Sequence, residues 1–290
     1  MERSILAAVS NARPALRGDY SRIAPDHTID QDWADYTAAE HALWRKLYDR
    51  QMRLVPRYAC EEFLHALDRL DASAAIPRFA EVSRKLRRAT GWELVAVPGL
   101  IPDLAFFEHL AHRRFPVTGW LRRPEEAEYI VEPDVFHDFF GHVPLLFDPV
   151  YADYMAAYGA GGLKAARLDS LPHLARLYWY TVEFGLLRTP EGVRAYGAGL
   201  LSSSGELVYA AESAEPRRVR FDLERLLRTE YRIDRFQDTY FVIDGFERLI
   251  ADTAADFTPV YERIRRLPAI APDEAAWEDV VERAGTARSR

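Results

Sequence analysis

Glu132-Pro133-Asp134-Val135-Phe136-His137-Asp138-Phe139-Phe140-Gly141-His142-Val143-Pro144-Leu145-Leu146 is the stretch of sequence around which the rest of the chain is organised. It carries two of the eight histidines, with two aspartates and one glutamate, among aromatic and aliphatic residues. Imidazoles in apolar surroundings need a partner, because an unpaired polar group costs free energy when it leaves water. We therefore expect His137 and His142 to bind a metal ion.

The same stretch contains signals for the start and the end of a helix. Pro133 suits a first helical turn, where its missing N–H is not needed. Gly141 is a natural C-cap, and Pro144 cannot continue a helix. Residues five apart on an ideal α-helix point about 140° away from each other. We therefore place His137 inside a helix and His142 beyond its end, folded back at Gly141.

A third metal ligand is expected at Glu183, which lies in the apolar segment 177–186. A carboxylate there is costly unless it is paired or bound to a metal. Two imidazoles and one carboxylate form the facial triad of non-haem Fe(II) oxygenases. A zinc hydrolase with the same three ligands is the alternative, although its usual His-Glu-x-x-His pattern is absent. Two histidines satisfied within the core, without any metal, are a further alternative.

The composition argues against several classes of function. Of the 290 residues, 49% are hydrophobic, which is enough for a sizeable core. A net charge of −7, with both signs interspersed, argues against nucleic-acid binding. We find no apolar run of the ~18 residues that a membrane-spanning helix needs, and no signal-peptide pattern. The single cysteine, Cys60, can form no internal disulfide, so we expect a cytoplasmic location.

Apolar residues recur at helical spacing along most of the chain, which predicts a mainly α-helical protein with a few short strands. We predict a single domain over residues 32–268. A loosely ordered segment, 1–31, precedes it, and a peripheral tail, helical or frayed, covers 269–290. Inside the domain we predict helices over 172–187 and 235–249 and a glycine-rich loop over 159–162.

Three blocks of sequence, Glu132 to Leu145, Tyr178 to Leu186 and Tyr196 to Leu207, resemble those of the pterin-dependent aromatic amino acid hydroxylases, in the same order. The resemblance runs from about Trp33 to Leu249. It implies a single basket-like, mainly helical catalytic domain with Fe(II) at the base of a deep cleft. The implied iron ligands are His137, His142 and Glu183. The implied cofactors are Fe(II) and tetrahydrobiopterin or a related tetrahydropterin.

The resemblance also implies the residues that bind the substrate. Arg122 matches the arginine that binds the substrate carboxylate, and Asp134 matches the residue that holds this arginine. A guanidinium group suits a carboxylate because it can donate two parallel hydrogen bonds. Ser202 matches a serine that supports the first iron-binding histidine. The aromatic-substrate pocket is matched by Pro133, Trp179 and Phe184.

For the pterin, the resemblance implies a second group of residues. Phe106 matches the aromatic residue that stacks on the pterin ring, and Asp138 and Tyr178 line the same side. The backbone that hydrogen-bonds the edge of the pterin is matched by Gly99, Leu100 and Ile101. Two departures from the family pattern, Ser204 in place of a bulky aromatic residue and Ile130 in place of a hydroxyl residue, leave substrate affinity open.

The resemblance is strongest to bacterial members that act on phenylalanine, so the expected reaction is hydroxylation of L-phenylalanine to L-tyrosine with O₂. Hydroxylation of tryptophan, tyrosine or the meta position of phenylalanine is the alternative within the family. Outside it, the alternatives are a zinc hydrolase and a binding protein without activity. The tail after Pro272 has no heptad run, and we expect a monomer.

Overall fold

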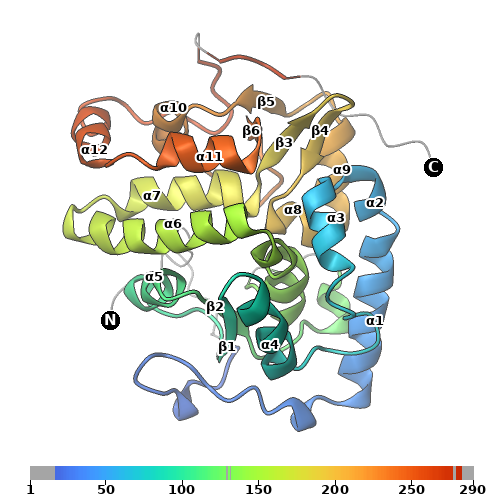
Figure 1. The fold of residues 1–290 in the computed structure, drawn as a ribbon. Helices are drawn as coiled ribbons and strands as arrows, with labels where there is room; N and C mark the ends of the chain where they lie inside the picture. Colours follow the sequence, from blue (N-terminus) through green and yellow to red (C-terminus); the bar gives the residue numbers. More distant parts are fainter. Residues whose placement is uncertain (1–16, 129, 131, 277–278, 283–290) are drawn as a thin grey trace.

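The computed structural model describes residues 17–128, 130, 132–276 and 279–282. As predicted, the fold is mainly α-helical with short strands (Figure 1). The helices are α1 (Ala38–Met52), α2 (Val55–Tyr58), α3 (Glu61–Leu67), α4 (Phe79–Ala89), α5 (Asp103–Ala111), α6 (Pro149–Arg167), α7 (Leu171–Tyr178), α8 (Ala198–Ser202), α9 (Ser204–Glu212), α10 (Leu223–Arg228), α11 (Phe246–Thr253) and α12 (Thr258–Ile264). The strands are β1 (Glu93–Val97), β2 (Arg114–Thr118), β3 (Leu186–Thr189), β4 (Gly192–Ala195), β5 (Arg217–Arg220) and β6 (Thr239–Ile243).

The strands form two small sheets. Parallel strands β1 and β2 make the first, with Glu93 opposite Arg114. The second has the order β4-β3-β6-β5, in which β3 and β4 are an antiparallel hairpin and β6 runs parallel to both of its neighbours. Figure 1 shows α6 and α7 crossing the middle of the molecule, between α5 on one side and α11 with the second sheet on the other. The two sheets therefore lie on opposite sides of the helical layer.

Helix α6 runs without interruption through the glycines that we expected to form a loop over 159–162. The reason is the close approach of α5. A Cβ atom on Gly159 would lie 2.3 Å from the backbone nitrogen of Ala111, and one on Gly162 would lie 2.0 Å from the ring of Phe107. These two glycines therefore allow two helices to pack closely, and they do not break the helix.

The predictions over 172–187 and 235–249 are wrong in part. The first helix gives way to a π-helical turn (Trp179–Glu183), and β3 begins at Leu186. The second segment contains β6, and α11 begins only at Phe246. All five residues of β6 are buried, because this strand lies between β3 and β5. An apolar run buried on both sides has no strand periodicity, so its pattern does not distinguish a strand from a helix.

The described part of the tail forms neither the peripheral helix nor the frayed end that we expected. Val281 forms an antiparallel bridge with Val219 of β5. A buried ion pair joins Arg225 of α10 to Asp279, with 2.9 Å between Nε and Oδ1. Of the predicted N-terminal segment, residues 1–16 lie outside the described residues, while Ile29 bridges to Ala96 of β1. The domain bounds 32–268 stay a prediction.

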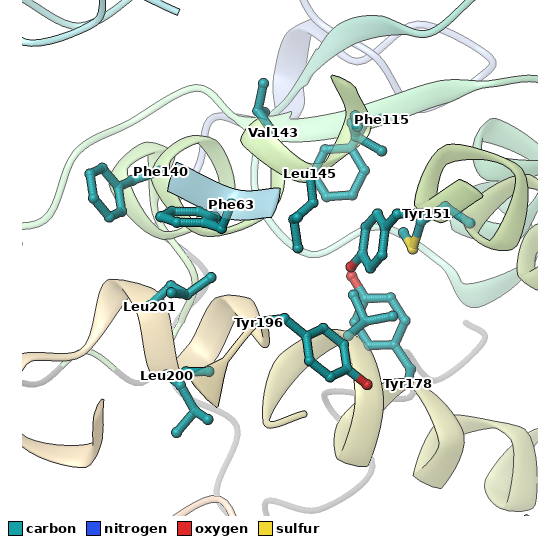
Figure 2. Packing of buried hydrophobic residues seen from close by; sticks show 14 of the residues in the cluster. Phe63, Phe115, Phe140, Val143, Leu145, Tyr151, Tyr178, Tyr196, Leu200 and Leu201 are labelled. Carbon is teal, nitrogen blue, oxygen red and sulfur yellow. The ribbon is translucent and has the colours of Figure 1, made fainter. Parts of the chain in front are cut away.

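An aromatic cluster lies behind the histidine-containing stretch and fixes it in the core. The rings of Phe136 and Phe140 are stacked, with their centroids 5.1 Å apart. Trp44 of α1 meets Phe136 edge-on, and Phe63 of α3 meets Phe140 in the same way. Figure 2 shows Phe63 and Phe140 side by side in this core. Ring contacts of Phe136 and Phe140 with α1 and α3 therefore anchor the stretch in the core.

Candidate active site

A π-helical turn (His137–His142) brings the two histidines together. Because hydrogen bonds in a π-helix join residues five apart, side chains at this spacing point in similar directions. The two imidazole centroids are 5.2 Å apart. Our expectation of a chain break at Gly141 is wrong, since this glycine lies inside the turn. A Cβ atom there would lie 2.8 Å from Cβ of Ala198, so Gly141 allows α8 to approach.

The start of this helix also differs from the expectation. It begins at Val135, so Pro133 lies ahead of the first turn. Asp134 caps the helix: its Oδ1 accepts a hydrogen bond from the backbone nitrogen of His137 at 3.0 Å. Aspartate is among the strongest N-caps because its oxygen satisfies a free N–H at the helix start. The cap thus fixes the backbone that carries the first histidine.

Glu183 faces both histidines from the second π-helical turn (Trp179–Glu183). Its Oε2 lies 3.5 Å from Nε2 of His137, and its Oε1 lies 3.2 Å from Nε2 of His142. One ligand atom from each of the three residues lies within 4.8 Å of the other two. Bonds from zinc to such atoms are about 2.0–2.2 Å long, so one ion of this size fits between them. The structure thus brings together the three predicted ligands.

The electrostatics of this cluster favour an ionised carboxylate. Burial opposes the charge of Glu183, but attraction to His142 and His137, together with hydrogen bonds to both, holds the pKa of Glu183 well below its usual range. Burial likewise opposes the charge of His137, yet the facing Glu183 raises the pKa of His137. Without a metal ion, a proton on the imidazoles supplies the positive charge that stabilises the Glu183 carboxylate. A metal cation between the three groups would supply this charge instead. The site is therefore built for positive charge.

Ser202 of α8 determines which nitrogen of His137 faces the cluster. The Ser202 hydroxyl donates its only proton to the carbonyl of Ala198 at 2.8 Å. It therefore accepts at the 2.9 Å contact with Nδ1 of His137, which must carry the proton. Where a metal ion takes the place of a proton on Nε2 of His137, the lone pair of that nitrogen would be directed into the cluster. This is the arrangement in which a supporting residue fixes the tautomer of a metal-binding histidine.

Arg122 and Asp134 form a buried, two-pronged ion pair. Nε and Nη2 of Arg122 donate to the two carboxylate oxygens of Asp134, each at 2.8 Å. The backbone nitrogen of Arg122 also donates to Asp134 at 2.8 Å. Although burial works against ionisation, Arg122 holds the pKa of Asp134 below its usual range. One carboxylate thus orients the arginine and caps the helix of His137.

Aromatic residues connect the region predicted for the pterin to the metal cluster. The half-buried ring of Phe106 meets Tyr178 edge-on, with centroids 5.7 Å apart. Tyr178 in turn stacks on His142 at 6.1 Å. Asp138 is buried, which raises its pKa, and it accepts a hydrogen bond from the backbone nitrogen of Thr118 at 2.7 Å. Ring contacts thus lead from Phe106 through Tyr178 to His142, and Asp138 lies in the same π-helical turn as both histidines.

The backbone stretch Gly99–Ile101 lies beside two residues that sequence reasoning missed. Gly99 has a φ of 146°, and a Cβ atom there would lie 2.7 Å from Oε1 of Glu132. The Tyr20 hydroxyl donates to the carbonyl of Leu100 at 3.0 Å. Tyr20 is 80 positions away from Leu100 in the sequence, and no local pattern signals such a contact. Only glycine fits the first position of this stretch.

The aromatic wall predicted at Trp179 and Phe184 is present, and it includes a residue that was not predicted. The ring centroids of these two residues are 4.7 Å apart. Tyr231 stacks on the other side of Trp179, at 4.3 Å and with 16° between the ring planes. Trp179 precedes Glu183 by four residues in the same π-helical turn. The wall therefore stands next to the metal cluster.

Both departures from the family pattern lie among the described residues. Ser204 begins α9 and donates to Oε2 of Glu128 at 3.4 Å, a long hydrogen bond. Ile130 is half-buried. Neither residue contacts a candidate metal ligand through a hydrogen bond or an ion pair among the described residues.

Comparisons with known proteins agree with this geometry. Residues 16–266 match the family model of the biopterin-dependent aromatic amino acid hydroxylases. A phenylalanine-4-hydroxylase from Ralstonia nicotianae is 58% identical over 269 residues, which are 92% of this chain and 86% of that protein. The phenylalanine-4-hydroxylase of Chromobacterium violaceum is 56% identical over 91% of this chain and 90% of its own length.

Solved structures show the same likeness. A crystal structure of the Chromobacterium violaceum phenylalanine hydroxylase with iron and phenylalanine bound has a TM-score of 0.86, at 55% identity, and covers 90% of this chain and 96% of that one. A cobalt-bound structure of the same enzyme has a TM-score of 0.90, at 53% identity, and covers 93% and 99%. The family match extends beyond the region 33–249 in which the sequence blocks were recognised. The chain belongs to the biopterin-dependent aromatic amino acid hydroxylases.

Proposed function

We propose that this chain is a phenylalanine 4-monooxygenase that converts L-phenylalanine to L-tyrosine with O₂ and a tetrahydropterin, at an Fe(II) ion bound by His137, His142 and Glu183. The observation that carries the proposal is the convergence of two imidazoles and one carboxylate within 4.8 Å. The names of the relatives, and the iron and phenylalanine in a structure 55% identical to this chain, support the choice of metal and substrate.

The three side chains fit an Fe(II) ion by their chemistry. Two neutral imidazoles and one carboxylate on one face of the ion leave the other positions open, as in non-haem Fe(II) oxygenases. When bound, the iron and the tetrahydropterin activate O₂ for transfer of one oxygen atom to the substrate ring. Ser202 keeps a proton on Nδ1 of His137, so that Nε2 is the nitrogen available to the metal, and the low pKa of Glu183 keeps its carboxylate charged. A zinc ion would find the same ligands, so the metal must be tested directly.

Arg122 is proposed to bind the carboxylate of the amino acid substrate. Asp134 occupies Nε and Nη2 of the guanidinium group, which leaves the edge with Nη1 for a second carboxylate. Because Arg122 is already held rigidly in a buried pair, little conformational entropy is lost when the substrate binds. Pro133, Trp179 and Phe184 would then contact the ring of the substrate.

The pterin is proposed to lie against the ring of Phe106. This ring is half-buried, so one part of it packs in the protein while another is free for stacking. The backbone of Gly99, Leu100 and Ile101 would hydrogen-bond its edge, and Asp138 and Tyr178 would line the same side. Tyr20 already donates to the carbonyl of Leu100, so this carbonyl has a partner before a pterin binds.

Membrane insertion, cellular location and oligomeric state also bear on this proposal. Among the described residues, no helix combines the length and the apolar character needed to cross a membrane. We further propose that the enzyme acts in the cytoplasm as a monomer. The single cysteine supports the location, because Cys60 can form no internal disulfide. Its burial raises the pKa of the thiol, as expected for an unreactive structural residue.

A product assay tests the proposal. The protein is loaded with Fe(II) without oxygen, then given O₂, tetrahydrobiopterin and one aromatic amino acid, and the products are identified by mass spectrometry. We expect tyrosine from phenylalanine, no product with zinc in place of iron, and less product from tryptophan or tyrosine. Absence of any pterin-dependent product would contradict the proposal. Glu183→Gln should lower the iron bound per chain at least tenfold, whereas Glu206→Gln, a buried carboxylate elsewhere, should retain iron.

A further inference from the structure

A loop of the chain, residues 229–238 between α10 and β6, holds Trp179 at its face and at its edge. Tyr231 stacks on the indole face at 4.3 Å. Gln237 accepts a hydrogen bond at Oε1 from the indole Nε1 at 3.0 Å. The neighbouring Tyr180 donates its hydroxyl proton to the carbonyl of Glu230 at 2.6 Å. The orientation of the Trp179 ring therefore depends on this loop as well as on its own helix.

Gln237 can present only its oxygen to Trp179. Its Nε2 donates to the carbonyl of Arg232 at 2.9 Å, and the carbonyl of Arg235 lies at 3.4 Å. Because both of these partners are acceptors, they must face the amide nitrogen, and the amide oxygen is left for the indole N–H. The side chain is 3% exposed, so water cannot replace the bond easily. The amide thus sets the plane of the tryptophan ring.

Glu206 of α9 anchors this loop through hydrogen bonds at its C-terminal end. Its Oε1 accepts hydrogen bonds from the backbone nitrogen of Gln237 and from the Tyr240 hydroxyl, both at 2.9 Å. The carboxyl group is 6% exposed and pairs with no cation among the described residues. Burial raises the pKa of Glu206 to about 7. A buried carboxyl without a countercharge is costly, so its two hydrogen bonds determine where it lies and what it holds.

The stretch from Ser202 to Glu206 thereby connects two parts of the site. Ser202 contacts the ring of His137, and Glu206, four residues later, contacts the loop that holds Trp179. The metal-ligand side and the substrate side of the pocket thus share one short support at the junction of α8 and α9. A displacement of the loop would move the aromatic wall while leaving the three candidate ligands in place.

We propose that Gln237 and Glu206 are positioning residues that fix the ring of Trp179 for the aromatic amino acid substrate, and so determine substrate affinity. The proposal rests on the proposed function, in which Trp179 forms a wall of the substrate pocket. Loss of the acceptor would leave the indole N–H buried and unpaired, which favours other orientations of the ring. Substrate binding would then have to restore the correct orientation.

The test is a double-mutant cycle between Gln237→Leu and Trp179→Phe, which removes the indole N–H but keeps an aromatic ring. In the otherwise unchanged iron-loaded enzyme, Gln237→Leu should raise the KM for phenylalanine about tenfold, with kcat changed less than threefold and iron content unchanged. In the Trp179→Phe background the same substitution should change KM less than twofold. Calorimetric titration with phenylalanine should give the same pattern in the Kd.

The controls separate positioning from damage to the fold. Gln31→Leu removes another glutamine whose amide bonds to the backbone, donating to the carbonyl of Pro77 and accepting from the nitrogen of Phe79, and it should leave the KM for phenylalanine unchanged. Glu206→Leu should raise KM, whereas Glu206→Gln, which keeps an acceptor oxygen, should stay within threefold of the unchanged enzyme. Should Gln237→Leu not fold, Tyr231→Leu tests the same loop through the stacking contact.

Each outcome has a distinct meaning. An equal rise in KM in both backgrounds, or no rise in either, would overturn the positioning role of Gln237. If Trp179→Phe alone leaves KM within twofold, the assignment of Trp179 to the substrate pocket fails, and with it this inference. If Trp179→Phe raises KM but Gln237→Leu does not, only the inference fails and the proposed function stands.

Discussion

Replacing Asp134 with asparagine should destabilise the protein strongly while barely changing the shape of the side chain. Each oxygen of Asp134 accepts two hydrogen bonds: Oδ2 from the backbone nitrogen and Nε of Arg122, and Oδ1 from Nη2 of Arg122 and the backbone nitrogen of His137. An amide nitrogen at either position would face two donors. The substitution also leaves the guanidinium of Arg122, which is 4% exposed, without its countercharge.

Two estimates of the cost agree. Breaking a buried ion pair by removing one partner costs about 3–5 kcal/mol. Losing two hydrogen bonds that involve charged groups, at about 1.5–3 kcal/mol each, gives a similar sum. We therefore expect Asp134→Asn to lower the free energy of unfolding by about 4 kcal/mol, and the Tm by roughly 10 °C for a chain of this size.

Thermal and urea unfolding, followed by circular dichroism at neutral pH, measure this loss. Asp153→Asn is the matched control, because Asp153 pairs with Arg113 at 2.6 Å on the surface, where removal of a partner costs at most about 1 kcal/mol. Arg122 holds the pKa of Asp134 low, so the stability from this pair is present above the ordinary aspartate pKa of about 3.9 and is lost as the pH falls further. A loss below 1 kcal/mol at neutral pH, or one equal to that of Asp153→Asn, would refute the reasoning.

Two further substitutions test the core of the site. Burial raises the pKa of Glu206 to about 7, so the native state holds this proton more tightly than the unfolded chain, and the resulting stability is lost as the pH rises from about 4.5 to about 7. Glu206→Gln should accordingly raise the free energy of unfolding at pH 8 by up to about 3 kcal/mol relative to the unchanged protein. Urea unfolding should show a smaller difference at pH 5. A difference that does not depend on pH would contradict this reasoning. Gly141→Ala should cost about 1–3 kcal/mol and lower iron retention, because its Cβ would press on Ala198 in the helix that carries Ser202. Gly161→Ala, where a Cβ meets nothing within 4 Å, is its control and should be neutral or slightly stabilising; equal effects of the two alanines in thermal unfolding and metal analysis would count against the close approach.

The chemistry of the candidate site could be predicted from the sequence because its polar side chains stand among apolar residues, where burial without a partner costs free energy. Histidines and a glutamate among phenylalanines and leucines signal a common partner wherever the chain places them. How the histidines meet could not be predicted. Gly141 and Pro144 are signals for the end of a helix, but the glycine is required by Ala198, which is distant in the sequence. The rule that glycine ends a helix failed at Gly141 because a contact with α8 requires the small residue there.

Similar reasons explain the other failures. Gly159 and Gly162 predicted a loop, but their small size serves the contact between α5 and α6. The residues of β6 are buried on both faces, so their pattern lacks the alternation of an exposed strand. Gln237 and Tyr20 carry no motif, because they meet the site only through long-range hydrogen bonds. What sequence patterns miss here is the set of contacts between segments far apart in the chain.

The two π-helical turns have a consequence for how this protein can vary. Each turn accommodates one more residue per turn of backbone than an α-helix would, and all three candidate ligands lie in these turns. Adding one residue between His137 and His142 would place the histidines six apart, a spacing at which side chains point in different directions in an α-helix and in a π-helix, so that one imidazole would swing away from Glu183. Substitutions between the histidines that keep the packing with α1, α3 and α8 would leave the ligands in register, but an added residue would not. In this region the spacing of the ligands constrains the protein in addition to the identity of the intervening side chains.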